Sequence, residues 1–298
     1  MSDFLDLLAT TYIFPILVLT VTFGVGLTMT MASFARIFAR PKALSLGVLG
    51  QFVWLPAVAI AMGLLLPLGP VISLGLALIC LCPGGALSNA IVFAMNGRTA
   101  LSVSMTVCAS ILMMITLPFI LPPVVELLTG SPIPGVSTVG VLKSLVIAIA
   151  VPLALGMLIG NFFPQTADRL VRIIKPLSIL LIAAAVSLTF YNARHFVGAE
   201  ALPIMAAAAT LSVLGVGGGF LWSLLFGTDV EDALTIAIEV GVQNTPYVIF
   251  LASTVLGRPD LSVVVVSYGV MNLAVMFLLV FALRGVRQRS AERVAAAV

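Results

Sequence analysis

A cluster of oxygen-bearing side chains lies inside an apolar stretch near the C-terminal end of the sequence. Residues 239–247 read EVGVQNTPY, which places the carboxylate of Glu239 close to the amides of Gln243 and Asn244. Carboxylate, amide and carbonyl oxygens are the ligands that hard cations prefer. Of the eleven acidic residues, Glu239 alone falls in the middle of a segment long enough to cross a bilayer. Because a carboxylate at that depth is costly, we expect a function for Glu239 rather than a hydrogen bond between helices alone.

A second polar stretch, CPGGALSN at 82–89, also interrupts an apolar segment. Pro83 removes a backbone donor, and the two glycines that follow it loosen the helix. In the C-terminal cluster, Asn244 followed by Thr245 and Pro246 has the pattern of a helix start, a capping side chain and then proline. The sequence therefore predicts two broken helices. Unwound carbonyl oxygens favour a cation there, and half-helices that begin in mid-membrane favour an anion.

Three further polar side chains occur in apolar surroundings. Ser102 and Thr106 are four residues apart and share one helix face, and Gln51 is an isolated amide. Taken alone, each is explained as well by helix packing, since small polar side chains often bond within and between membrane helices.

The composition defines the setting of these residues. The chain has 298 residues, 61% of them hydrophobic and 8% charged, with a mean hydropathy of +1.26. Soluble domains carry about 25% charged residues, so this composition indicates a polytopic membrane protein and gives no support for a nucleic-acid partner. Three cysteines without a CxxC pair and one histidine do not make a zinc site. No pair of membrane aspartates is present for an intramembrane protease, so we do not expect an enzyme.

The apolar segments predict an all-α fold with nine transmembrane helices. They lie at about 12–33, 43–66, 71–95, 99–121, 140–162, 175–191, 201–226, 232–255 and 262–284. The third and eighth contain the two breaks.

The basic residues predict the orientation of these nine helices. Eleven of the fourteen lysines and arginines fall on one side of the membrane, namely Arg36, Arg40, Lys42, Arg98, Arg169, Arg172, Lys175, Arg284, Arg287, Arg289 and Arg293. The positive-inside rule then places the N-terminus outside and the C-terminus in the cytoplasm, in a multi-pass protein of the cell inner membrane.

The two breaks also indicate an internal repeat. Each broken segment is followed by one more helix, so helices 1–4 correspond to helices 6–9 and helix 5 is unmatched. An offset of five helices makes the two halves inverted in the membrane. Paired interrupted helices in an inverted repeat point to the binding site of a secondary transporter.

The stretches CPGGALSN (82–89), ALSVSMT (100–106) and EVGVQNTP (239–246) resemble the signature stretches of the bile acid:sodium symporter family. The resemblance implies an inverted repeat whose first helix is missing here, and two broken helices that cross. It also implies a panel domain, at about 12–33 and 140–191, and a core domain, at about 43–121 and 201–284.

The resemblance further implies two sodium sites and a substrate site. The first sodium site maps onto Ser88, Asn89, Ser102, Thr106 and Glu239. The second maps onto Gln51, Glu239 and Gln243, with the backbone carbonyls of Val240 and Val242. The substrate site maps onto Ala86, Ser88, Asn244 and Thr245. Relatives often carry threonine in place of Ala86, which bears on the identity of the substrate.

We therefore predict sodium-coupled symport of an organic anion by alternating access. The anion is bile-acid-like or a small carboxylate such as pantoate. Two sodium ions and the lipid bilayer are the other expected partners, and no obligatory protein partner is indicated. The alternative is a proton-coupled carrier on the same fold, with Glu239 as the proton site.

Overall fold

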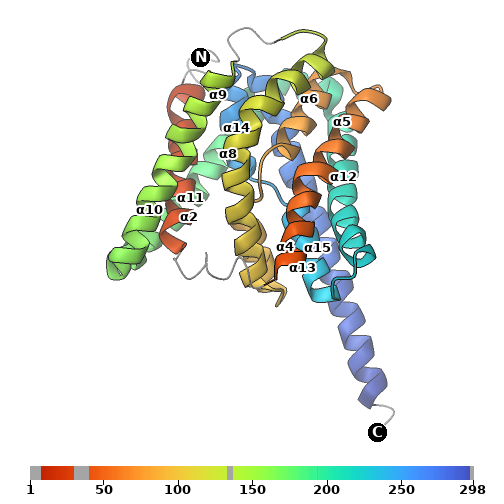
Figure 1. Cartoon of the computed structure of the whole chain (residues 1–298). Coiled ribbons are helices and arrows are strands. Elements are labelled where there is room, and N and C mark those ends of the chain that lie inside the picture. Colours follow the sequence, from red (N-terminus) through yellow and green to blue (C-terminus); the bar gives the residue numbers. More distant parts are fainter. Residues whose placement is uncertain (1–7, 30–39, 133–136, 193, 296–298) are drawn as a thin grey trace.

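The computed structural model describes residues 8–29, 40–132, 137–192 and 194–295. Within these ranges the chain is helical and forms no strand, apart from a single antiparallel bridge between Gly84 and Gln243. The helices stand roughly parallel to one another (Figure 1), and α15 extends beyond the others at its C-terminal end.

The elements of the first half, with η denoting a π-helical turn, are η1 (Ala9–Ile13), α2 (Phe14–Thr28), α4 (Pro41–Leu49), η3 (Gly50–Trp54), α5 (Leu55–Leu65), α6 (Gly69–Cys80), α7 (Ala86–Ala94) and α8 (Thr99–Thr129). Those of the second half are α9 (Thr138–Leu145), η4 (Val146–Ala150), α10 (Val151–Phe162), α11 (Pro164–Asn192), α12 (Arg194–Leu225), α13 (Val230–Gly241), α14 (Thr245–Phe250), η5 (Leu251–Val255) and α15 (Pro259–Ala295).

Seven helices in the described part of the chain are long and apolar enough to cross a membrane, and two shorter apolar helices accompany them. The seven lie at Ala9–Thr28, Pro41–Leu65, Thr99–Thr129, Thr138–Phe162, Pro164–Thr189, Glu200–Leu225 and Pro259–Leu279, and the shorter two at Gly69–Cys80 and Thr245–Val255. The prediction of a polytopic helical membrane protein is confirmed at this level.

Several predicted helix boundaries are wrong by more than a turn, among them the starts of α11 and α12 and the ends of α8 and α15. The sixth segment was placed from 175, but α11 begins at Pro164, because proline is well suited to the first position of a helix and the charged residues that follow are exposed on its surface. The fourth segment was placed up to 121, but α8 continues through Pro122 and Pro123 to Thr129. Gly130 ends it in the left-handed conformation, with φ of 76°.

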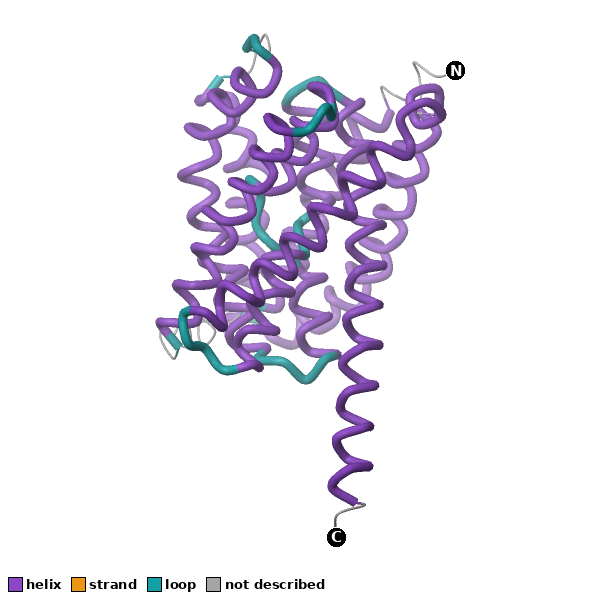
Figure 2. Tube along the Cα trace, turned by 90° about the vertical axis from the view of Figure 1, so that its right-hand side faces the viewer, coloured by secondary structure: helices purple, strands orange, loops and turns teal. Residues whose placement is uncertain are grey.

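Both segments that the sequence marks as interrupted are broken in the structure, and their breaks touch. Residues 81–85 separate α6 from α7, and residues 242–244 separate α13 from α14. The backbone N–H of Asn244 donates to the carbonyl of Pro83 at 3.0 Å, beside the bridge between Gly84 and Gln243. Figure 2 shows these short loop segments inside the bundle, enclosed by helices. The unwound backbone of each break is thus partly satisfied by the other.

The helices form two packed groups. Helix α2 packs against α10 and α11, and these three lie side by side at one edge of the bundle (Figure 1). The approach of α2 to α10 depends on glycine, because a Cβ atom on Gly26 or on Gly156 would come within 2.4 Å of a carbonyl oxygen of the other helix. The second group includes α12, α13 and α15, with α4, α5, α6 and α8 packed around them. The breaks lie in this second group.

Candidate functional site

Glu239 lies in the last turn of α13, and its side chain is fully buried. Two hydroxyls from α8 donate to its carboxylate. Ser102 bonds one carboxylate oxygen, and Thr106 bonds the other at 3.1 Å. The spacing of four residues between the two hydroxyls brings both onto the face of α8 that meets α13.

Helix α7 contributes two more polar side chains to the group around this carboxylate. The Asn89 amide nitrogen donates to Thr106 at 3.1 Å, and its carbonyl oxygen lies 2.6 Å from the Ser102 hydroxyl. Ser88 is fully buried, donates to the carbonyl of Gly85 at 2.7 Å and also interacts with the Glu239 carboxylate. The structure therefore brings together all five residues of the first predicted site, from three helices.

Gly84 leaves a space beside this carboxylate. A Cβ atom at this position would lie 2.9 Å from Glu239 Oε2 and 3.3 Å from both the Ser88 hydroxyl and the Val242 carbonyl oxygen. Three oxygens thus converge on a point that only glycine keeps open. A donor set made of one carboxylate, hydroxyls, an amide and carbonyls has the chemistry that a hard cation needs.

A second group of polar side chains includes Gln51, which is buried in the π-helical turn η3. Such turns are rare and occur often at functional sites. The Gln51 amide nitrogen lies 3.5 Å from the Gln243 side-chain oxygen, and the Gln243 amide donates to the Val240 carbonyl at 2.7 Å. The Gln51 side-chain oxygen is buried and has no hydrogen-bond partner among the described residues. Since an unpartnered buried acceptor is costly, a bound cation there would be stabilising.

Side chains of α15 hold the end of α13. Tyr268 and Asn272 of α15 both donate to the carbonyl of Gly241, the latter at 2.9 Å. Asn272 also donates to Ser212 of α12 at 2.8 Å. Two donors thus satisfy one of the carbonyls that a helix end leaves without a partner. An amide in an apolar helix was the only sign of this contact in the sequence.

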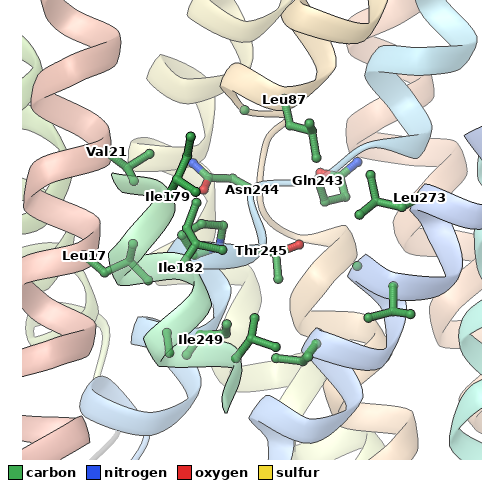
Figure 3. A pocket seen from close by; sticks show the side chains of 17 residues that line it. Leu17, Val21, Leu87, Ile179, Ile182, Gln243, Asn244, Thr245, Ile249 and Leu273 are labelled. Carbon is green, nitrogen blue, oxygen red and sulfur yellow. The ribbon is translucent and has the colours of Figure 1, made fainter. Parts of the chain in front are cut away.

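A cavity of about 370 Å³ lies next to the two breaks. Gln243, Asn244 and Thr245 contribute its polar groups, and Figure 3 shows these side chains among the apolar residues that line the same space. Leu17 and Val21 come from α2, and Ile179 and Ile182 come from α11. The cavity is therefore lined both by helices of the group of α2, α10 and α11 and by the group that contains the breaks.

Only some of the residues predicted to bind the substrate line this cavity. Asn244 and Thr245 line it, whereas Ser88 is fully buried and outside the lining. The backbone of Ala86 begins α7 beside the cavity-lining residues Gly85 and Leu87, and its side chain lies outside the described part of the chain. The apolar wall from α2 and α11 was not predicted, because nothing in the sequence distinguishes a cavity-lining isoleucine from a lipid-facing one.

Comparison with known proteins gives matches over most of the chain. The sequence model of the Sodium Bile acid symporter family matches residues 15–200. The chain is 30% identical over 225 residues to the uncharacterized sodium-dependent transporter YocS of Bacillus subtilis (strain 168), a match covering 76% of this chain and 68% of that protein.

Two further relatives come from eukaryotes. The probable sodium/metabolite cotransporter BASS1, chloroplastic, of Arabidopsis thaliana is 28% identical over 242 residues, which cover 81% of this chain and 59% of the relative. The human ileal sodium/bile acid cotransporter is 25% identical over 237 residues, which cover 78% of this chain and 66% of the relative. The chain thus spans about three fifths to two thirds of the length of these two relatives.

Proposed function

Because the chain belongs to the sodium bile acid symporter family, a family of sodium-coupled transporters, we propose that it carries an organic anion into the cell together with sodium ions. The observation that supports this most directly is the buried carboxylate of Glu239, surrounded by neutral oxygen donors from other helices. A charge held this way in mid-membrane is stabilised when a cation joins it.

The proposed topology has nine crossings of the cell inner membrane. Seven are the continuous apolar helices, and the other two are the broken pairs α6 with α7 and α13 with α14 and η5. Figure 1 supports an odd number, because the first described helix begins at one end of the bundle and α15 ends at the other. The N-terminus would be outside and the C-terminus cytoplasmic, and the two broken pairs would occupy corresponding places in an inverted repeat. Reporters fused to the two ends test this, and finding both on one side of the membrane would contradict it.

The proposed mechanism is alternating access between a panel domain and a core domain. The panel comprises about 12–33 and 140–191, and the core about 43–121 and 201–284. The packing of α2 with α10 and α11 supports the panel as one unit, and the cavity between this unit and the breaks is where substrate would lie. Movement of the core against the panel would then expose the cavity to one side of the membrane at a time.

Two sodium ions are proposed to bind within the core. The first would be held by Ser88, Asn89, Ser102, Thr106 and Glu239, and the second by Gln51, Glu239 and Gln243 with the carbonyls of Val240 and Val242. The single carboxylate of Glu239 would partly neutralise both ions, and the neutral oxygens would replace their water. Occupation of both sites would order the breaks, which carry the substrate-binding residues.

The proposed substrate is an organic anion, either bile-acid-like or a small carboxylate such as pantoate. Ala86, Ser88, Asn244 and Thr245 are its proposed contacts. Support comes from the starts of α7 and α14 at the edge of the cavity, since helix N-termini attract negative charge. The proposal requires no protein partner.

One alternative has a specific observation in its favour. The Glu239 carboxylate is buried and bonded by hydroxyl groups, and no basic side chain in the described part of the chain pairs with it, so a proton could replace sodium in the cycle. A sodium gradient and a pH gradient, imposed separately across proteoliposomes, distinguish the two couplings. Concentrative uptake driven by sodium alone supports symport, and uptake driven by pH alone supports the proton carrier.

The substrate can be found by a thermal-shift screen of organic acids with and without sodium. A ligand that binds the folded protein raises its melting temperature, so a coupled substrate should give a larger shift in sodium than in potassium. An acid that stabilises the protein equally in both salts would not be a sodium-coupled substrate.

A further inference from the structure

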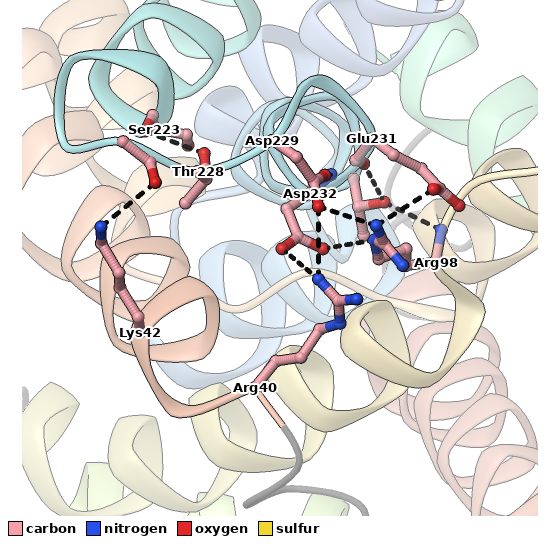
Figure 4. A network of polar contacts seen from close by, with 10 residues as sticks. Arg40, Lys42, Arg98, Ser223, Thr228, Asp229, Glu231 and Asp232 are labelled. Atoms are coloured by element: carbon pink, nitrogen blue, oxygen red, sulfur yellow. Dashed lines mark hydrogen bonds and ion pairs between the residues drawn. The ribbon is translucent and has the colours of Figure 1, made fainter.

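Figure 4 shows a network of charged side chains that includes none of the residues of the proposed binding sites. It joins the starts of three helical segments: α4 through Arg40, α8 through Arg98, and α13 through Asp229, Glu231 and Asp232. Arg98 contacts all three carboxylates, at 2.6 Å to Asp232, 2.7 Å to Asp229 and 3.2 Å to Glu231. Arg40 lies 2.7 Å from Asp232 and 3.4 Å from Asp229.

Asp232 is the centre of this network. Its side chain is only 7% exposed, and its two oxygens are divided between the two arginines, Oδ1 with Arg98 and Oδ2 with Arg40. An ion pair on the surface contributes little, but a buried carboxylate shared by two guanidinium groups is costly to break, because one partner is left charged and unpaired. Asp232 therefore restrains α4 and α8 against α13 at the same time.

Backbone contacts extend the restraint along α13. The backbone N–H of Arg98 donates to the hydroxyl of Thr235 at 3.0 Å, and that hydroxyl donates to the carbonyl of Glu231 at 2.8 Å. Thr235 is fully buried. A Cβ atom on Gly97 would lie 3.2 Å from the same hydroxyl, so the turn before α8 lies directly against α13. In addition to the ion pairs, this contact therefore fixes the position of α8 along the axis of α13.

Helical spacing connects this network to the proposed sodium sites. Ser102 follows Arg98 by four residues and Glu239 follows Asp232 by seven, or about 6 Å and 10 Å along the two helices at 1.5 Å per residue. Seven residues are close to two turns, so Asp232 and Glu239 lie on one face of α13, and Arg98 directly precedes the first turn of α8, which ends at Ser102. Gln51 follows Arg40 by eleven residues, and Arg40 directly precedes the continuous segment formed by α4 and η3.

Each of the three charged residues lies near the start of a segment that carries residues of the proposed sodium sites. Arg98 directly precedes the helix that carries Ser102 and Thr106, and Arg40 directly precedes the segment that carries Gln51. Asp232 lies in the first turn of the half-helix that carries Glu239, which both sites share. We infer that Arg98 positions the first sodium site, Arg40 positions the second, and Asp232 positions both. This inference rests on the proposed sodium coupling and adds three positioning residues that do not themselves touch the ions.

Sodium titrations of purified variants, followed by melting temperature, test the inference. Arg98→Gln should raise the sodium concentration for half-maximal stabilisation about tenfold, the lower end of what loss of a supporting contact costs at a metal site. In the double variant with Thr106→Ala, this sodium concentration should rise by less than the product of the two single increases. In the double variant with Gln51→Ala, the two increases should multiply. Arg40→Gln should show the opposite pattern. A purely structural role would lower the melting temperature without sodium but would not produce this selectivity.

Conservative variants and a matched control keep the test decisive. Asp232→Asn keeps size and should weaken both sites, and Arg98→Lys keeps the charge and should recover part of the loss. These two decide the matter if Arg98→Gln does not fold. Arg258→Gln is the control, because Arg258 pairs with Asp260 at 2.6 Å and its side-chain exposure of 33% is close to the 26% of Arg98. Among the described residues, no ion pair joins Arg258 to α8 or α13.

The possible results separate this inference from the proposed function. If the parent protein and Glu239→Gln are equally insensitive to sodium, the proposed coupling is wrong. If the parent responds to sodium and the Arg98, Arg40 and Asp232 variants respond at the same concentrations as the parent, the coupling stands and the positioning role is wrong.

Discussion

Replacing Gly84 by alanine would test whether the oxygens around Glu239 enclose a cation. The new methyl group would lie 2.9 Å from Glu239 Oε2 and 3.3 Å from the Val242 carbonyl oxygen and the Ser88 hydroxyl. The carboxylate cannot move aside freely, because Ser102 and Thr106 hold both of its oxygens. The Val242 oxygen belongs to the backbone of the break, which is bonded to the other break at Pro83 and Gly84.

The expected magnitude follows from the cost of inserting a methylene into a packed interior, about 1–3 kcal/mol. If this cost applies mainly to the ion-bound arrangement, sodium binding should weaken by about 5- to 150-fold, since 1.4 kcal/mol corresponds to a factor of ten. The assay is a sodium titration of the melting temperature in detergent, with potassium keeping the ionic strength constant. The melting temperature without sodium measures any general loss of stability separately.

Gly217→Ala is the matched control, since a Cβ atom at Gly217 in α12 would meet no other atom within 4 Å. It should bind sodium like the parent and be slightly more stable, because alanine favours a helix over glycine. If Gly84→Ala folds and binds sodium with unchanged affinity, no ion occupies the space beside Gly84, and the first proposed site is wrong.

Three other predictions concern the sites, the coupling and the charged network. Thr106→Ala should weaken one sodium site and Gln51→Ala the other, so that isothermal titration of each shows one affinity retained and one reduced; equal loss of both would contradict separate sites. Two sodium ions with one monoanion carry net positive charge inward, so uptake into proteoliposomes should be faster with an inside-negative potential, and uptake that ignores the potential would contradict this stoichiometry. The backbone N–H of Asp232, followed by Arg98 and Arg40, holds the pKa of Asp229 below its ordinary value of 3.8. The stabilisation from this charge is therefore complete above pH 3.8 and is lost as the pH falls below it, so Asp229→Asn should reduce the loss of melting temperature in acid, and an unchanged acid profile would contradict the assigned role.

The breaks in the two interrupted helices could be predicted because their cause is local. Pro83 with two glycines, and Asn244 followed by Thr245 and Pro246, determine where a helix stops and restarts, whatever surrounds them. The start of α11 at Pro164 was missed because charged residues in its first turns resemble a loop in a hydropathy pattern. The end of α8 was missed because Pro122 and Pro123 usually stop a helix, whereas here the helix continues to Thr129.

The contacts around Glu239 could be expected only through family resemblance. Ser102 and Glu239 are 137 residues apart in the chain, and no periodicity shows that they meet. The network of Asp232 with Arg40 and Arg98 was missed for the same reason, since each residue alone is typical of a charged loop. The cavity wall depends on Leu17 and Ile179, whose apolar side chains suit lipid and ligand equally.

The most direct test of the account is sodium binding by Glu239→Gln. This substitution keeps the shape of the side chain and most of its hydrogen bonding, but removes the charge that both proposed ions share. We predict that the parent is stabilised by sodium over potassium and that Glu239→Gln loses this stabilisation completely, while Thr106→Ala and Gln51→Ala lose only part of it. If Glu239→Gln is stabilised by sodium at the same concentrations as the parent, the carboxylate is a packing residue or a proton site, and the sodium-coupled mechanism proposed for this chain is wrong.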